Sequence, residues 1–133
     1  MVALRHCPHF LRCAGLRLLT SLRGADLSFA GLQGADLSRA SLCGADLIGK
    51  DLRNVSFREA DLQRARLGLS GLQGADLRSA DMRDAWLNNA CLVGVDLRGA
   101  DLRGTHLDNA VYDRSTRWPD GFEPAKRGAV LDK

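Results

Sequence analysis

The chain has 133 residues, of which 45% are hydrophobic and 26% charged, and a formal net charge of +3, so we expect one domain with enough apolar residues for a core. It contains no run of about 18 apolar residues, which argues against a transmembrane helix and against a membrane partner. Its four cysteines do not form a disulfide-like framework, which favours a reducing compartment, and we expect a cytoplasmic protein.

Residues 1–19, MVALRHCPHFLRCAGLRLL, do not follow the pattern of the rest of the chain. Arg12 and Arg17 stand where that pattern would place leucine, so we predict an N-terminal cap or irregular segment. A targeting peptide is the alternative, because the segment has no acidic residue. Against that alternative, Pro8 and the scattered arginines leave no proper apolar h-region.

From residue 20 to residue 114 a large, mostly aliphatic residue recurs at every fifth position. Five residues advance an α-helix by about 500°, so leucines at this spacing would spiral around its axis. A single long strand would point them alternately to opposite faces, because five is odd. These residues can all face one interior if the chain coils around a narrow core. Each five-residue unit then contains a short extended piece followed by a bend. These central residues are Leu22, Leu27, Leu32, Leu37, Leu42, Leu47, Leu52, Phe57, Leu62, Leu67, Leu72, Leu77, Met82, Leu87, Leu92, Leu97, Leu102, Leu107 and Tyr112.

The positions around each central residue, numbered from −2 to +2, have their own preferences. Position −2 is mostly alanine and faces inward with the centre, as alternate residues of one strand do. Position −1 is often aspartate, which can hydrogen-bond to nearby backbone, and position +2 is often glycine, as a bend would require. Lys50 is the one large residue at position −2. We expect a locally widened coil from which Lys50 reaches outward, with Asp51 as its candidate partner.

Nineteen consecutive units of the type Ala-Asp-Leu-x-x, as in GADLSFAGLQGADLSRASLCGADL and GVDLRGADLRGTHL, resemble the pentapeptide-repeat proteins. This resemblance implies an all-β fold, a right-handed quadrilateral β-solenoid with four units in each coil. The solenoid would have about 4.75 coils, each in contact only with its neighbours, and would need a cap at both ends.

Residues 115–133 leave the repeat and contain a strong turn signal, Pro119-Asp120-Gly121. Trp118, Phe122 and Val130 are apolar residues in this otherwise polar tail. We predict that the tail folds back over the last coil and covers its leucines and strand edges. The predicted organisation is therefore an N-terminal cap or irregular segment (1–19), a solenoid (20–114) and a C-terminal capping tail (115–133).

One face of the predicted solenoid carries apolar residues at outward positions, because residues 20 apart stack when four units form a coil. We expect this face to contact an unidentified protein partner or a second copy of the chain. Scattered surface hydrophobes without a partner are the alternative. The interaction-face candidates are Phe29, Ile48, Leu69 and Trp86.

The adjacent face stacks arginines, whose mutual repulsion an anionic partner would relieve. Solvated arginines balanced by neighbouring acidic side chains are the alternative. The arginines concerned are Arg39, Arg58, Arg78 and Arg98. Strong nucleic-acid binding is not expected, because few phosphates could be matched at once.

We predict no enzyme, no catalytic residue and no cofactor, because no nucleophile, base and pocket converge along the repeat. The aspartates recur with the repeat and His106 takes a position where aspartate is usual, so both have structural or surface explanations. No metal site is predicted either, since the N-terminal cluster lacks a second pair of ligands at structural-zinc spacing. That cluster consists of His6, Cys7, His9 and Cys13.

The predicted function is a rigid, non-enzymatic scaffold for protein interaction. The alternative comes from the resemblance, because some pentapeptide-repeat proteins mimic duplex DNA and bind type II topoisomerases such as DNA gyrase, protecting them from quinolones. DNA mimicry needs a strongly acidic surface. Residues 20–114 hold 12 lysines and arginines against 13 acidic residues, and this near-neutrality disfavours a topoisomerase partner.

Overall fold

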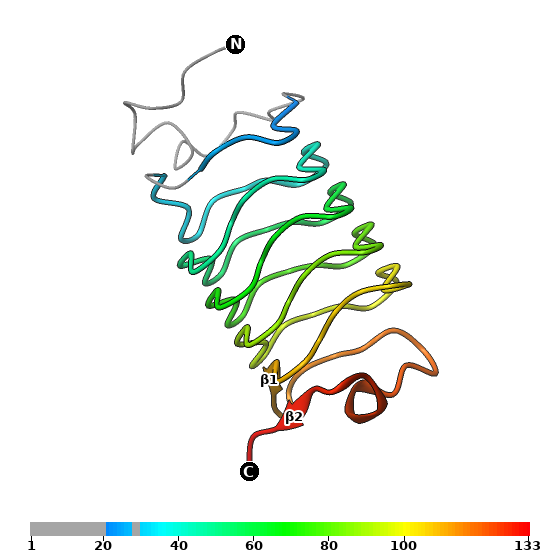
Figure 1. Ribbon diagram of the computed structural model, residues 1–133. Helices are drawn as coiled ribbons and strands as arrows, with labels where there is room; N and C mark the ends of the chain where they lie inside the picture. Colours follow the sequence, from blue (N-terminus) through cyan, green and yellow to red (C-terminus); the bar gives the residue numbers. More distant parts are fainter. Residues whose placement is uncertain (1–20, 28–29) are drawn as a thin grey trace.

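The computed structural model describes residues 21–27 and 30–133, which form a stack of four-sided coils along one axis (Figure 1). Residues 20 apart pair through parallel β-bridges, as from Ser41 to Asp61, Asp81 and Asp101. We number the four sides by their central residues. Side 1 contains Leu22, Leu42, Leu62, Met82 and Leu102; side 2 contains Leu27, Leu47, Leu67, Leu87 and Leu107; side 3 contains Leu32, Leu52, Leu72, Leu92 and Tyr112; side 4 contains Leu37, Phe57, Leu77 and Leu97.

The backbone hydrogen bonds explain why a five-residue unit is stable. Within a unit the chain closes a tight turn, as when the Ala65 N–H donates to the Leu62 carbonyl at 3.0 Å. Between coils the Leu62 N–H donates to the Asp81 carbonyl at 2.8 Å, and the Asp81 N–H donates back to the Ala60 carbonyl at 2.9 Å. Each coil thus satisfies the polar backbone of the coil before it.

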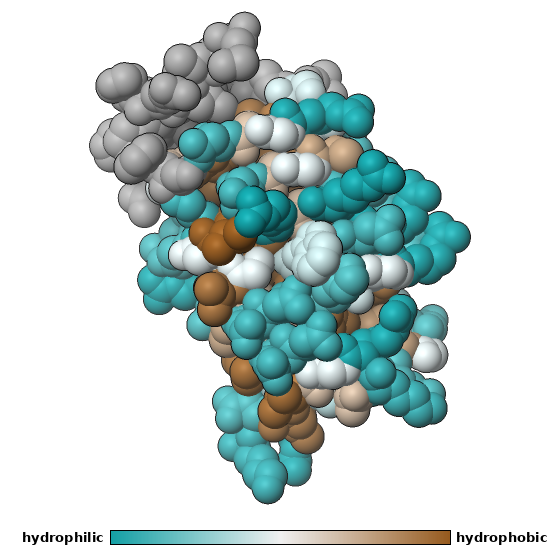
Figure 2. All heavy atoms as spheres, in the orientation of Figure 1, coloured by the Kyte–Doolittle hydropathy of each residue, from teal (hydrophilic) through white to brown (hydrophobic). Residues whose placement is uncertain are grey.

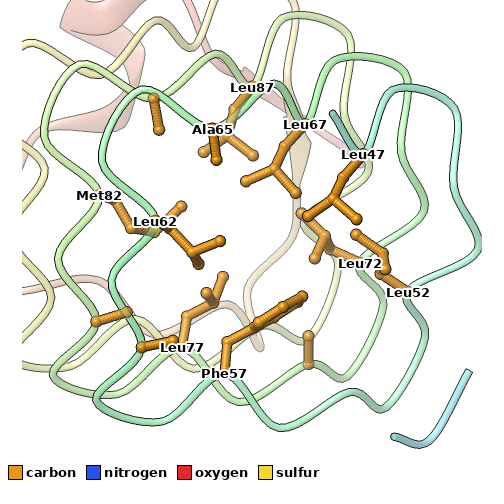
Figure 3. Packing of buried hydrophobic residues seen from close by; sticks show 14 of the residues in the cluster. Leu47, Leu52, Phe57, Leu62, Ala65, Leu67, Leu72, Leu77, Met82 and Leu87 are labelled. Atoms are coloured by element: carbon orange, nitrogen blue, oxygen red, sulfur yellow. The ribbon is translucent and has the colours of Figure 1, made fainter. Parts of the chain in front are cut away.

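The core is a continuous column of the central residues and the small residues at position −2. The described central residues up to Leu107 are at most 5% exposed, and burial of each large side chain contributes about 1.5–3 kcal/mol. Figure 3 shows these side chains pointing from the four sides towards a common interior. The alternation predicted for positions −2 and 0 is confirmed, because alanines such as Ala65 and Ala85 are also buried.

Positions −1 and +2 have the roles expected of them. Aspartates at −1 accept a hydrogen bond from the backbone N–H two residues later, as Asp61 does from Gln63 at 3.1 Å. Every described +2 position up to Asn109 has a φ between +57° and +72°. Glycine adopts such angles without strain, whereas most other residues do so at a cost.

The ladder of β-bridges is interrupted beside Lys50. Among the described residues, Gly31 and Asp51 form no bridge, although the next pair on this side, Asp51 and Gly71, does. The Lys50 side chain is half-buried, where most described residues at position −2 are buried. The Asp51 carboxylate accepts hydrogen bonds from the Arg53 guanidinium at 2.7 and 2.8 Å. The open ladder agrees with a locally widened coil, and the direction of the lysine side chain stays a prediction.

Coil stacking continues past residue 114, where the five-residue frame ends. The next step has six residues instead of five, so Arg117 takes position −1 on side 4 and pairs with Asp96. Thr116, buried at position −2, donates from its hydroxyl to the Leu92 carbonyl at 2.9 Å. The sequence boundary at 114 therefore marks one inserted residue, which hides this last unit from the repeat pattern.

The tail forms the C-terminal end of the stack, shown in orange and red in Figure 1. Strand β1 (Val111–Tyr112) on side 3 pairs in parallel with β2 (Val130–Leu131), and a short 3-10 helix, η3 (Pro124–Arg127), precedes β2. Trp118 and Phe122 pack against the core and stack on each other with their ring centroids 5.2 Å apart. Within the described part of the chain, no helix is long and apolar enough to cross a bilayer.

Candidate functional site

Side 2 carries the exposed apolar residues that the sequence placed on one face. Ile48, Leu69 and Trp86 are 39%, 66% and 48% exposed, and they come from three successive coils of that side. Phe29, the fourth candidate, lies outside the described residues. We call Ile48, Leu69 and Trp86 the side-2 apolar residues.

The side-2 apolar residues do not form one continuous patch. Trp86 is at position −1, before the centre of its unit, and Leu69 is at position +2, in the turn of its unit, so they occupy opposite edges of the side. Position +1 between these edges holds Ile48, Gly68 and Asn88 in successive coils, stacked about 4.8 Å apart. Together the three side chains expose on the order of 300 Å², less than half of the roughly 800 Å² that one partner contributes to a standard interface. They could supply the centre of an interface but not all of it.

Leu69 has no evident reason to be a leucine for folding. Its φ is +59°, a conformation that costs most L-residues about 1–2 kcal/mol, and two-thirds of its side chain faces solvent. The equivalent residue of the previous coil is Gly49 and that of the next is Asn89, both residue types that favour this conformation. The repeat imposes this φ on every described +2 position up to Asn109, so the exposure of a large apolar side chain is what makes Leu69 a candidate for contact with a partner.

Trp86 lies in a row of stacked polar and aromatic side chains at position −1 of side 2. Its indole stacks on the His106 imidazole, with ring centroids 4.0 Å apart and an angle of 17° between the rings. In the two preceding coils, Arg66 donates a hydrogen bond to the Asp46 carboxylate at 3.0 Å. His106 occupies an aspartate position, as the sequence indicated, and packs against the largest apolar candidate.

The arginines of side 4 are paired with carboxylates. Arg78 makes two hydrogen bonds to Asp76, at 2.6 and 2.9 Å, and these bonds lower the pKa of the Asp76 carboxyl. Arg98 binds Asp96 in the same way. The ion pairs of the four candidate arginines are Arg39 with Glu59 at 2.9 Å, Arg58 with Glu59 at 3.6 Å, Arg78 with Asp76 at 2.6 Å and Arg98 with Asp96 at 2.7 Å. An anionic partner would have to compete with these carboxylates.

A second set of ion pairs lies on side 1 and was missed from the sequence. Arg83 binds Asp81 at 2.7 Å, and Arg103 binds Asp101 at 2.6 Å. The hydrogen bonds from Arg103 lower the pKa of Asp101 to about 2. The signal was present as the motif Asp-x-Arg, which places a carboxylate at position −1 and a guanidinium at position +1 of one unit.

The C-terminal end exposes a further apolar group. Val130 and Leu131 of β2 are about half exposed, and Figure 2 shows apolar atoms at this end of the molecule. The sequence predicted Val130 as part of a cap and did not single out Leu131. Both residues stack on β1 but have no coil above them among the described residues.

The described residues contain no group of three histidine, cysteine, aspartate or glutamate side chains that could hold a metal ion. The N-terminal histidine and cysteine cluster lies outside those residues. Cys43 and Cys91 are free, half-buried thiols on sides 1 and 3.

Comparison with known proteins places the chain in a family. The family model for pentapeptide repeats matches in eight copies, over residues 20–42, 35–70, 56–92, 70–99 and 90–111. No curated protein sequence matches the chain. Among solved structures, HetL from the cyanobacterium Nostoc sp. strain PCC 7120, a pentapeptide-repeat protein involved in the regulation of heterocyst differentiation, is 37% identical with a TM-score of 0.59. That alignment covers 68% of this chain and 39% of HetL.

Two other structures extend the comparison. A further pentapeptide-repeat protein of Nostoc PCC 7120 is 37% identical with a TM-score of 0.43, over 73% of this chain and 84% of that one. The plasmid-mediated fluoroquinolone resistance protein QnrB1 is 17% identical with a TM-score of 0.39, over 85% of this chain and 78% of QnrB1. The repeat match spans more than half of the chain, so the protein belongs to the pentapeptide-repeat family and folds as a right-handed quadrilateral β-solenoid.

Proposed function

We propose that the protein is a rigid, non-enzymatic scaffold in the cytoplasm that binds another protein through side 2. Leu69 carries the proposal, since two-thirds of this apolar side chain is exposed and its burial by a partner would be favourable. Trp86 adds an aromatic side chain of the type enriched at binding hot spots. The stacked coils would hold these side chains at fixed spacing, so little order is lost on binding.

Modulation of a topoisomerase is not part of this proposal. DNA mimicry needs an acidic surface, and the arginines of sides 1 and 4 lie within 4 Å of carboxylates that they neutralise. The likeness to QnrB1 extends to the fold alone. We expect the purified protein, at micromolar concentration, to leave supercoiling by DNA gyrase unchanged.

Site-specific photo-crosslinking in the native host tests the scaffold proposal. A photoreactive amino acid replaces Leu69 on side 2 or, as the matched control, Gln63 at an outward position on side 1. We expect a crosslinked species from position 69 that is absent from position 63 and is lost when Trp86→Ser is added. Equal crosslinking from both positions, or no effect of Trp86→Ser, would refute binding through side 2.

Light scattering after size exclusion then separates self-association from binding of a different protein. The parent is compared with a variant carrying Ile48→Ser, Leu69→Ser and Trp86→Ser, whose fold is checked by circular dichroism. A dimeric parent and a monomeric variant identify a second copy as the partner. A monomeric parent that still crosslinks from position 69 identifies another protein.

A further inference from the structure

In the described part of the chain, the last complete coil has two sides, 1 and 2, that no strand covers. On side 4 the coil is covered by Arg117, which pairs with Asp96, and on side 3 it is covered by β2. On side 2 the tail forms no bridge and makes one backbone hydrogen bond, from the Asn109 N–H to the Gly128 carbonyl at 2.8 Å. On side 1 the tail makes a turn at residues 119–122 and forms no bridge with the edge at residues 100–104.

Each step on side 1 from Leu42 to Leu102 is held by three backbone hydrogen bonds in one register. In each step, the N–H groups at positions 0 and +2 donate to carbonyls of the next coil. The carbonyl at position −2 accepts from an N–H of the next coil. In the step before the uncovered edge the three bonds are Met82 N–H to Asp101 carbonyl at 2.9 Å, Asp84 N–H to Arg103 carbonyl at 3.0 Å and Asp101 N–H to Ala80 carbonyl at 2.9 Å.

The same three groups of the last coil have no partner in the described part of the chain. They are the N–H groups of Leu102 and Gly104 and the carbonyl of Ala100. The edge lies at the surface, because Gly104 is exposed and Leu102 is 5% exposed where its equivalent Met82 is 0% exposed. This edge therefore has the hydrogen-bonding pattern of an unpaired edge strand.

An open groove of about 430 Å³ lies along this edge. Residues 99–103 form one wall, and the turn at residues 119–122 and Arg127 form the other. The Phe122 ring lines the groove, with the Arg127 guanidinium 5.8 Å from its centroid. An extended backbone with an apolar side chain could lie in this groove, against the edge on one side and Phe122 on the other.

The ion pairs of side 1 indicate the charge of the missing strand. Arg83 binds Asp81 in its own coil and reaches Asp101 in the next, at 4.0 Å. Arg103 binds Asp101 in its own coil, and no described residue continues side 1 beyond it; its side chain is 77% exposed against 41% for Arg83. A carboxylate stacked above Asp101 would extend the ladder by one step.

We propose that the edge at residues 100–104 docks an extended segment of another protein, which adds one parallel strand to side 1. The register requires a small residue, then an acidic residue above Asp101, then a large apolar residue. The acidic residue donates its N–H to the Ala100 carbonyl, accepts from the Leu102 N–H and places its carboxylate beside Arg103. Binding by strand addition takes its affinity from main-chain hydrogen bonds and its specificity from alternate side chains. This site is separate from side 2 and does not depend on the proposed function.

The test uses the whole protein and a capped peptide, Gly-Ala-Asp-Leu-Arg-Gly, which has the required pattern. Amide resonances are followed by NMR up to about 2 mM peptide, since three backbone hydrogen bonds on a small surface predict a dissociation constant on the order of 1 mM. We expect the Leu102 and Gly104 amides to shift and to exchange more slowly with solvent. The Met82 amide, already bonded, is the internal control.

Two changes isolate the interactions. N-methylation of the peptide aspartate removes the donor for Ala100 and should weaken binding more than about tenfold. Arg103→Gln keeps an exposed side chain of similar length without charge and should weaken binding about threefold, as expected for an exposed ion pair. Absence of shifts at 2 mM, shifts confined to side 2, or equal binding of the N-methylated peptide would each overturn the strand-addition proposal. Equal affinity of the parent and Arg103→Gln would overturn its acidic preference.

Discussion

Leu69→Asn tests whether this leucine is present for folding or for binding. Asparagine tolerates the positive φ better than leucine, so the substitution should raise the free energy of unfolding by about 1 kcal/mol through reduced backbone strain. Asn54, Asn89 and Asn109 adopt this conformation elsewhere in the solenoid. Loss of the one-third of the side chain that is buried should cost about 0.5–1 kcal/mol. The two effects nearly cancel, so we expect the stability to change by less than about 1 kcal/mol.

The matched control is Leu67→Ala, because Leu67 lies in the same coil and side but is fully buried. Its truncation leaves a cavity between the leucines of the adjacent coils and should cost about 2–5 kcal/mol. Urea denaturation followed by circular dichroism measures both variants, and a shift in midpoint at constant slope reports the change in stability.

A loss of more than about 1 kcal/mol in Leu69→Asn would refute this reasoning, because Leu69 would then have a structural role that its exposure hides. A small change in stability together with loss of partner binding would assign the leucine to binding. In a variant that folds as well as the parent, loss of binding cannot be attributed to unfolding.

Three further predictions follow from local geometry. The pKa of Asp101 is lowered from 3.8 to about 2, so its contribution to stability is complete above about pH 4 and is lost as the pH falls towards 2. In Asp101→Asn, the melting temperature should therefore fall less steeply over this pH interval than in the parent. An unchanged slope would contradict the ion pair. Gly104→Ala should lower the free energy of unfolding, measured by urea titration, more than Gly44→Ala does. Both glycines have a φ near +70°, but only a Cβ at Gly104 would meet neighbouring atoms. Equal losses of stability would show that the backbone strain alone determines the effect. The Leu32 N–H has no backbone hydrogen bond to the next coil among the described residues, so we expect it to exchange rapidly with solvent. Lys50→Ala restores a small residue at position −2 and should slow this exchange. Slow exchange in the parent would contradict a widened coil.

The surface could be predicted only in part. The sequence placed Ile48, Leu69 and Trp86 on one side, because stacking by 20 residues follows once four units form a coil. It could not show that Leu69 and Trp86 lie at opposite edges of that side, since this depends on where each residue falls relative to the corner of the coil. It suggested a repulsive arginine ladder on side 4, whereas Arg78 and Arg98 reach back two residues to Asp76 and Asp96. Such pairing depends on side-chain conformation, which no repeat pattern specifies.

The sequence by itself determined the coil, its inward residues and its bends. A five-residue frame repeated nineteen times leaves few backbones that bury every central residue, and alanine, aspartate and glycine each fit one position of the unit. Only the tertiary structure decided how the solenoid ends. One inserted residue before Arg117 conceals a further unit. The tail pairs with sides 3 and 4 of the last coil, makes one hydrogen bond to side 2 and leaves side 1 without a backbone partner among the described residues. These contacts join residues without a repeating pattern, and their register depends on the coil already formed beneath them.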